Sequence, residues 1–483
     1  MLLPNACLTR REVLKTASCG FGYLALASLC TERAAAEYQN PLAPKTPHFK
    51  ARAKRIIFLS MRGGPSHVDT FDYKPKLAED AGKAVTALSG QVQDRNRGRS
   101  LLPSPFEFKR SGQSGLPISE LFPHVGQHAD DLCLLNSMYT DVPNHPQSWL
   151  MLHTGEFRFT RPSMGAWLLY GLGTENQDLP GYITISPPAD LGGAQNYGNG
   201  FLPASFQGTR IGQQGTAVAG ASIGNITNAD RSGEAQRRQI DFIQAMNQDL
   251  LQRKQVNPEL EGVINSMELG FRMQHSLPQL LDISKESQAT LDLYGIAKGR
   301  GAGAGNGKNA NGGNASTDDF GRQCLLARRF CEAGVRFVEV SLGNWDTHGG
   351  LKSRLTSLCG QIDKPIGGLL TDLKQRGLLQ DTLVLWGGEF GRTPTGQGTD
   401  GRDHNSAGFS MWLAGGGVKG GMRYGATDEH GSRAVENKLH HHDLHATLLH
   451  LMGLDHQKLS YRYGGRDYTL TDIHGRVAKE IMA

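Results

Sequence analysis

The sequence predicts an α/β protein with a mostly parallel central sheet covered by helices on both faces. Short apolar runs rich in β-branched and aromatic residues, bounded by glycines, alternate with stretches that have apolar residues at helical spacing. This alternation is typical of parallel sheets, because each crossover connection places a helix against a face of the sheet.

Five elements of the C-terminal half carry most of this prediction. The helical stretches end at or just before a glycine, which is a common helix stop. The expected strands cover Val335–Leu342, Thr382–Trp386 and Phe409–Ala414, and the expected helices cover Phe320–Ala333 and Ser353–Arg376.

Polar clusters stand beside these strands. Trp345–His348 follows the first strand, Gly388–Thr393 follows the second, and Gly401–His404 precedes the third. In an open α/β sheet, ligands bind at the loops beyond the carboxyl ends of the strands. The sequence therefore predicts that the clusters converge on one site, and their carboxylates and imidazoles are the ligand types of a metal centre.

The N-terminus resembles a twin-arginine export signal, which is removed from the mature protein. Arg10 and Arg11 precede a weakly apolar stretch, Ala17–Leu29, and Ala34–Ala36 supplies small residues for cleavage. The stretch is too short to span a bilayer comfortably, so no stable transmembrane anchor is expected. We expect residues 1–36 to be the signal peptide and residues 37–483 to be exported to the periplasm or the cell exterior.

Composition limits the kinds of protein to which this chain can belong. A net charge of +5 is small for 483 residues and gives no indication of nucleic-acid binding. Cys324 and Cys331 are expected to be buried small side chains on a helix. Residues 258–318 are expected to contain a helical insertion, Pro258–Tyr294, and then a flexible loop rich in glycine and asparagine.

Several segments between Arg55 and Asp472 also come in a recognisable order. They are Ile56–Ser60, Asn144–Gly155, Thr382–Gly391, His404 with Phe409–Gly421, and Asp443–Asp455. This order resembles the alkaline phosphatase/sulfatase superfamily, and specifically its exported branch filed as domain of unknown function family 1501. The resemblance implies an alkaline-phosphatase-like core and the hydrolysis of phosphate or sulfate esters.

The chain departs from the superfamily's pattern at three positions. The first strand continues into Met61-Arg62-Gly63-Gly64, where working members have a metal-binding Asp. His145 stands at the nucleophile position, and Glu389-Phe390 replaces the usual Asp-His or Asp-Asn pair. The resemblance therefore does not imply the usual two-metal site or the usual Ser, Thr or formylglycine nucleophile.

A single divalent ion remains compatible with these residues. Asp346, His348 and His404 supply a carboxylate and two imidazoles, which leaves a coordination position open. Such an ion lowers the pKa of a bound water to about 7, so a covalent nucleophile is not required. Asp403 is a further candidate ligand, and Glu389 is a candidate ligand or general base. The ion is expected to be zinc, calcium, manganese or magnesium.

Other polar residues are candidates for supporting roles. His145 is a candidate general acid, ligand or phosphoryl acceptor, and Arg392 could clamp an anionic oxygen in bidentate fashion. His67 and Asp69, after the first strand, are candidate supporting or replacement ligands.

Structural explanations compete with each of these roles. Asp346 could cap a turn, Glu389 could simply pair with Arg392, and Asp403-His404 could belong to a plain turn. The histidine-rich segment His440–His442 with His445 looks like a metal tract, but Asp443 is expected to be the N-cap of a helix that reaches Leu451.

Two classes of function follow. The first is an exported metal-dependent hydrolase whose substrate is a small anionic ester or a sulfated or phosphorylated glycan. The second is a catalytically inactive member of the fold that binds an anion or a protein. Because sites rather than folds define function, the geometry of the polar clusters must decide between them.

Overall fold

A nine-stranded sheet forms the centre of the part of the chain that the computed structural model describes, residues 40–85, 99–218, 232–254, 258–297 and 317–483. The strand order is β12-β4-β11-β8-β1-β7-β5-β6, and β15 also pairs with β4. The strands are β1 (Arg55–Met61), β4 (Leu132–Tyr139), β5 (Tyr182–Ile185), β6 (Thr209–Ile211), β7 (Phe337–Leu342), β8 (Thr382–Gly387), β11 (Phe409–Gly415), β12 (Met422–Tyr424) and β15 (Leu439–His440).

One strand of this sheet runs against the others. β1 pairs in parallel with β7 and β8, and β5 pairs in parallel with β6 and β7, whereas β11 is antiparallel to both β8 and β4. The chain between β8 and β11 forms only a short hairpin of β9 (Gly391–Gln397) and β10 (Gly401–Asn405), so no crossover helix restores the direction. The predicted α/β class with a mostly parallel sheet is confirmed.

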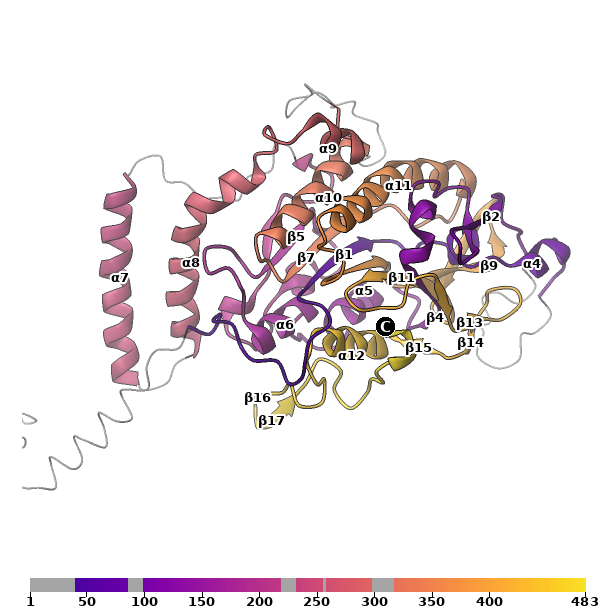
Figure 1. The fold of residues 1–483 in the computed structure, drawn as a ribbon. Coiled ribbons are helices and arrows are strands. Elements are labelled where there is room, and N and C mark those ends of the chain that lie inside the picture. The colour runs from indigo at the N-terminus through magenta and orange to yellow at the C-terminus, as the bar shows by residue number, and fades with distance from the viewer. Residues whose placement is uncertain (1–39, 86–98, 219–231, 255–257, 298–316) are drawn as a thin grey trace, which may run out of the picture.

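Helices cover both faces of the sheet, as Figure 1 shows. Within β1, Ile57 and Leu59 pack with the apolar residues of α10 and α11, while Ile56 and Phe58 pack with those of α5, α6 and α12. This alternation follows from the two-residue period of a strand. The covering helices are α5 (His145–Thr154), α6 (Met164–Leu172), α10 (Thr317–Glu332), α11 (Leu351–Gln375) and α12 (His441–Leu451).

Smaller elements surround the core. They are α3 (His67–Thr70), α4 (Pro75–Glu79), α9 (Gln288–Leu293) and the two-stranded pairs β2 (Phe108–Ser111) with β3 (Leu116–Ser119), β13 (Ala426–Thr427) with β14 (Ala434–Glu436), and β16 (Tyr461–Tyr463) with β17 (Arg466–Tyr468). Short 3₁₀ segments cover Val125–Asp131, Gly193–Tyr197, Ala204–Phe206 and Lys479–Ile481.

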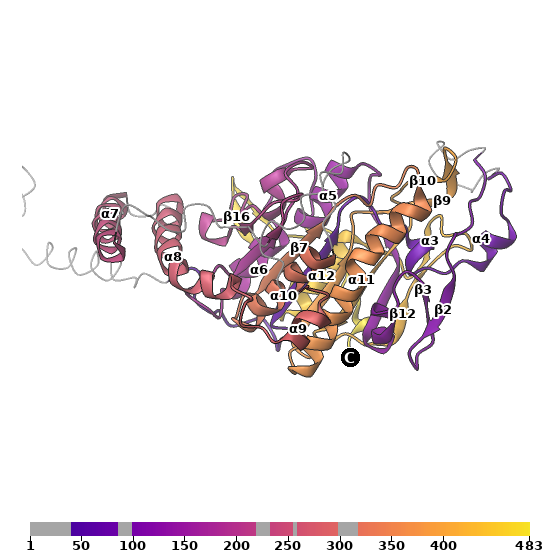
Figure 2. The same ribbon diagram turned by 90° about the horizontal axis from the view of Figure 1, so that it is seen from above.

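Two long helices extend the molecule at one end. In Figures 1 and 2, α7 (Gly233–Lys254) and α8 (Pro258–Leu281) lie side by side beyond α6 and β5. The expected insertion begins with α8 and includes α9, but α7 was not predicted. The predicted glycine-rich loop, residues 298–316, and the predicted signal peptide lie outside the described residues.

The five predicted elements of the C-terminal half are confirmed as β7, β8, β11, α10 and α11, with ends that differ by a few residues. The prediction for α12 was wrong in one respect. Its N-cap is His440, whose Nδ1 accepts from the His442 N–H, and Asp443 closes the capping box from the third helical position by accepting from the His440 N–H.

Two further findings concern burial and hydropathy. Cys324 and Cys331 are buried on α10 as free thiols, as predicted. None of the helices in the described ranges combines the length and the apolar character needed to cross a membrane.

Candidate metal centre

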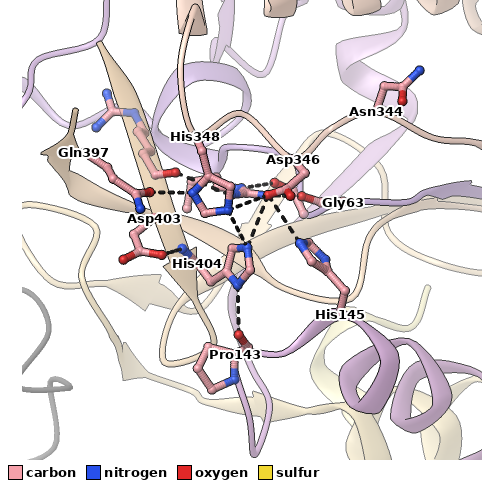
Figure 3. Close-up of polar contacts among 12 residues, drawn as sticks. Gly63, Pro143, His145, Asn344, Asp346, His348, Gln397, Asp403 and His404 are labelled. Atoms are coloured by element: carbon pink, nitrogen blue, oxygen red, sulfur yellow. Dashed lines mark hydrogen bonds and ion pairs between the residues drawn. The ribbon is translucent and has the colours of Figure 1, made fainter. Parts of the chain in front are cut away.

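The carboxyl ends of three parallel strands and the start of α5 meet at one edge of the sheet. Met61 ends β1, Leu342 ends β7 and Gly387 ends β8, and the loops that follow carry Gly63, Asp346 and Glu389. β10 brings His404 to the same place, as Figure 3 shows. The predicted convergence of the three polar clusters therefore occurs in this structure.

One carboxylate oxygen lies at the centre of this group. Asp346 Oδ1 is 2.9 Å from His348 Nε2, 3.2 Å from His404 Nε2 and 3.3 Å from His145 Nε2. The two nitrogens His348 Nε2 and His404 Nε2 are themselves 3.0 Å apart. Asp346, His348 and His404 thus present three potential ligand atoms within about a hydrogen-bond length of one another.

The outer nitrogen of each imidazole is held by an oxygen. His145 Nδ1 donates to Glu389 Oε1 at 2.6 Å, His404 Nδ1 donates to the Pro143 carbonyl at 2.9 Å, and His348 Nδ1 donates to Gln397 Oε1 at 2.5 Å. Because these oxygens accept, each Nδ1 carries the hydrogen and each Nε2 presents its lone pair to the centre when the ring is neutral.

The facing lone pairs have a chemical consequence. His348 Nε2 and His404 Nε2 would repel each other and the Asp346 carboxylate if nothing positive stood among them. A proton or a metal cation relieves this repulsion, and imidazoles whose outer N–H is held by a carbonyl or carboxylate are the usual form of metal-binding histidine. The donor set fits a divalent ion.

Glu389 lies one layer behind the group. Its side chain is fully buried, its Oε1 accepts from His145, and both of its oxygens face the N–H of Gly63 at 3.0 and 3.1 Å. The Asp346 side chain, in contrast, is 41% exposed. In this arrangement Asp346 faces the open side of the site, and Glu389 supports His145.

Arg392 points inward instead of toward the opening. Its buried guanidinium donates to the carbonyls of Gly63 and Gly64 and to Asp346 Oδ1, the last at 2.5 Å. Burial tends to lower the pKa of Arg392, and the Asp346 charge opposes that effect. The expected clamp on a substrate oxygen is not available to this conformation.

Asp403 is close to the imidazoles, but its carboxylate bonds to Arg99 and to the His404 backbone. His145, Asp346 and His404 form one group of three potential ligand atoms, and Asp403 joins His348 and His404 in another. Its Oδ2 pairs with Arg99 Nη1 at 2.8 Å, and its Oδ1 accepts from the His404 N–H. Asp403 therefore orients the backbone that carries His404 and remains within reach of an ion.

His67 and Asp69 have structural partners. Asp69 forms a fully buried bidentate pair with Arg402, at 2.7 and 3.1 Å, and His67 Nε2 lies 2.8 Å from the Gly431 carbonyl. Neither residue belongs to the groups of potential ligand atoms found among the described residues. Their contacts instead tie α3 to β10 and to the loop before β14.

Close backbone packing requires glycine where β1 approaches this site. Gly63 has φ +116°, and a Cβ there would lie 2.5 Å from the Asp346 nitrogen. The absence of a side chain lets the chain after β1 pass directly against the Asp346 backbone. The same approach brings the Gly63 N–H to Glu389 and the Gly63 carbonyl to Arg392.

The pKa values reflect this crowding. Burial alone would raise the pKa of Asp346, but its contacts with the His145 and His404 imidazoles and the Arg392 charge hold it far below its usual range. Burial alone would lower the pKa of His145, but hydrogen bonds to Asp346 and Glu389 raise it to about 9. A strongly anionic carboxylate thus sits among groups that carry or attract positive charge.

The supporting acceptors were missed in the sequence. Gln397 lies near the end of β9 and Pro143 in the loop before α5, and a lone amide or a backbone carbonyl gives no pattern to detect. Among the described residues, the histidine-rich segment around His440–His442 forms no group of three ligand atoms. His442 and His445 instead bond to the Gly155 and Leu152 carbonyls.

The family model described as protein of unknown function (DUF1501) matches residues 53–482. No curated protein matches the sequence. Among solved structures, the chain is similar to the lipoteichoic acid synthase LtaP from Listeria monocytogenes, with 9% identity, 92% of this chain and 80% of that chain covered, and a TM-score of 0.39. It is also similar to the PsFucS1 sulfatase from Pseudoalteromonas sp., with 13% identity, coverages of 90% and 72%, and a TM-score of 0.36. A third is a protein in the alkaline phosphatase superfamily from Vibrio parahaemolyticus, with 9% identity, coverages of 89% and 75%, and a TM-score of 0.35.

Proposed function

This chain belongs to the DUF1501 family, and from that premise we propose that it is an exported, metal-dependent hydrolase of phosphate or sulfate esters. The observation that carries the proposal is the convergence of His348 Nε2 and His404 Nε2 on Asp346 Oδ1, with both outer nitrogens held by oxygen acceptors. Two imidazole nitrogens and one carboxylate oxygen at these distances form the donor set of a divalent-metal site, and the oxygen acceptors fix the orientation of both rings.

Asp346, His348 and His404 would hold the ion, and Asp403 is a further carboxylate that can group with the two imidazoles. Imidazole nitrogen suits zinc better than calcium, magnesium or manganese, for which oxygen ligands are the more usual choice. Two histidines and one carboxylate leave a fourth position free for water or substrate. When bound, the ion would supply Lewis acidity to a phosphoryl or sulfuryl oxygen.

His145, oriented by Glu389, would donate a proton beside the ion. The Nδ1–H of His145 is fixed by Glu389, so Nε2 is the atom that faces the site. A protonated Nε2 can donate to the leaving oxygen of an ester as a general acid. Glu389 acts through His145 and is therefore a positioning residue.

The substrate class follows from the charges and the opening. Asp346 and His348 are the most exposed members of the group, with side chains 41% and 38% exposed, so an ester would approach from their side. A divalent ion and a protonated His145 would favour an anionic group there. The proposal therefore covers small phosphate or sulfate esters and glycans that carry them.

Export is part of the same proposal and rests on the sequence alone. The paired Arg10-Arg11, the weakly apolar stretch Ala17–Leu29 and Ala34–Ala36 support a twin-arginine signal. Proteins exported by that route fold before they cross the membrane, which would let a metal centre form in the cytoplasm.

The metal is tested first by elemental analysis of the purified mature chain. We expect about one divalent ion per chain in the wild type and loss of most of it in His348→Ala, since one of three ligands is gone. His48→Ala is the matched control, because His48 is an exposed histidine outside the site. A wild type without stoichiometric metal contradicts the proposal.

Activity is tested next with a panel of aryl phosphate and aryl sulfate esters and several divalent metals. Turnover that is lost on chelation and restored by zinc or another divalent metal of the panel supports the hydrolase. Stoichiometric metal with no turnover of any ester would instead identify a binding module built on the same centre.

A further inference from the structure

A cavity of about 460 Å³ lies between the end of α5, the start of α12 and residues 469–475. Its walls carry hydrogen-bonding groups of both charge signs, and none of them belongs to the metal centre. The charged and polar lining includes Asp141, Arg158, Arg161, His440, His442 and His474. A pocket with many donors and acceptors suits a ligand rich in hydroxyl groups better than an apolar one.

A cluster of aromatic rings adjoins this cavity through Arg161. The Arg161 guanidinium lies 4.2 Å from the ring centre of Tyr468 and 5.9 Å from that of Phe201. Phe201 in turn stacks on Tyr463, with 5.1 Å between ring centres and 15° between planes. We call this cluster the aromatic platform, and its members are Phe159, Phe201, Tyr461, Tyr463 and Tyr468.

Two rings of the platform are exposed to solvent. Phe159 is 64% exposed and Tyr463 is 55% exposed, whereas the large aromatic residues of the core are fully buried. Tyr463 lies on the β16–β17 hairpin, and Phe159 follows α5. Exposed aromatic rings gathered beside a polar pocket indicate a binding surface, because exposure of such area has a free-energy cost.

We propose that the cavity and the aromatic platform bind the sugar chain of a glycan. A sugar ring has an apolar face of C–H groups, which packs on the electron-rich face of an aromatic ring, and a rim of hydroxyls that need donors and acceptors. Phe159 and Tyr463 offer the ring faces, Arg158 and Asp141 offer charged hydrogen-bonding partners, and His474 offers an imidazole.

One loop of the chain contributes both to the wall of the cavity and to the metal centre. Asp141 lines the cavity, and two residues later the Pro143 carbonyl accepts from His404 Nδ1. The cavity lies at the C-terminal end of α5, and His145 begins the same helix. This inference rests on the proposed ester hydrolase and narrows its substrate to an ester carried on a glycan.

Binding is tested on an array of defined oligosaccharides that holds neutral and sulfated forms of the same chains. The mature wild type should bind at least one chain, and the affinity for that chain is then measured by titration. The double variant Phe159→Ala, Tyr463→Ala should bind about tenfold or more weakly, because it removes two stacking faces. Since both rings are exposed, the thermal unfolding midpoint should stay near that of the wild type.

Phe242→Ala is the matched control, because Phe242 is 67% exposed on α7, outside the platform. It should leave the affinity unchanged. Equal binding of neutral and sulfated chains would show recognition of the sugar backbone, and tighter binding of sulfated chains would add a role for Arg158 and Arg161. Both results support the proposal.

The inference is wrong if the wild type binds no chain on the array, or if the double variant binds as tightly as the wild type. Chelator-treated wild type separates this outcome from a failure of the proposed function. If glycans still bind when the metal is removed and no ester is turned over, the glycan-binding inference is supported and the proposed hydrolase is wrong. If ester turnover depends on metal but no glycan binds, the proposed hydrolase is supported and the glycan-binding inference is wrong.

Discussion

Glu389 Oε1 accepts a hydrogen bond from His145 Nδ1 at 2.6 Å, although the two residues are 244 positions apart in the chain. Both Glu389 oxygens also face the Gly63 N–H. One buried carboxylate thus joins the ends of β1 and β8 to the start of α5. Its position fixes which nitrogen of His145 faces Asp346.

Glu389→Gln should slow ester turnover by about 10–100-fold while the bound metal remains. The amide keeps the shape of the side chain but removes the charge that favours protonated His145. The measurement is kcat against pH together with metal content, with the exposed Glu436→Gln as control. Loss of the metal in Glu389→Gln would show that Glu389 is itself a ligand.

Arg392→Lys should destabilise the protein more than it changes substrate binding. The guanidinium donates to the Gly63, Gly64 and Arg402 carbonyls and to Asp346, and a lysine cannot reach all of them. Each buried acceptor left unpaired costs about 1–3 kcal/mol. Urea unfolding of this variant and of Arg423→Lys, an exposed control, measures the difference. A raised KM with unchanged stability would instead support the predicted role of Arg392 in holding an anionic oxygen of the substrate.

The parts of the fold that have strong periodicity could be predicted from the sequence. β7 and β8 are continuous apolar runs, and α11 buries one face of a long helical pattern. α7 was missed because its sequence is mostly polar, and its main packing partner among the described elements is α8. A helix that buries so little apolar surface leaves a weak pattern.

The candidate site was predictable only as far as its side chains are distinctive. Asp346, His348 and His404 could be singled out because carboxylate and imidazole groups stood beside three strands. The inward direction of Arg392 could not, because it depends on the Gly63 and Gly64 carbonyls, which become acceptors only when β1 and β8 are side by side. His440 could not be recognised as an N-cap because histidine seldom takes that position.

Replacement of both Arg10 and Arg11 by lysine should hold the precursor in the cytoplasm. The pair is the part of a twin-arginine signal that the export machinery reads, and lysine keeps the charge but not the guanidinium. Cell fractionation with an antibody against the mature chain measures the distribution. If the doubly substituted protein leaves the cytoplasm at the wild-type level, the export proposal is wrong.

A buried ion pair behind the site should make stability depend on pH. Glu339 on β7 accepts from His153 Nε2 at 2.8 Å and from Ser60 Oγ at 2.8 Å, and His153 Nδ1 donates to the Trp149 carbonyl. Burial tends to lower the pKa of His153, but the Glu339 charge outweighs it and the pKa is raised. Burial tends to raise the pKa of Glu339, but His153 outweighs it and the pKa is lowered.

The raised pKa of His153 means that its contribution to stability is complete below the ordinary histidine pKa of about 6.5 and is lost as the pH rises through the folded-state value. The lowered pKa of Glu339 means that its contribution is complete above about 4.3 and is lost as the pH falls through the folded-state value. The pair should therefore stabilise α5 against β7 most fully between these two limits.

Glu339→Gln removes the charge that raises the pKa of His153, so the fall in unfolding free energy above pH 6.5 should become shallower. Urea unfolding of wild type and Glu339→Gln from pH 4 to pH 9 compares the two slopes. Parallel curves across this range would mean that the pair is not ionised in the folded protein.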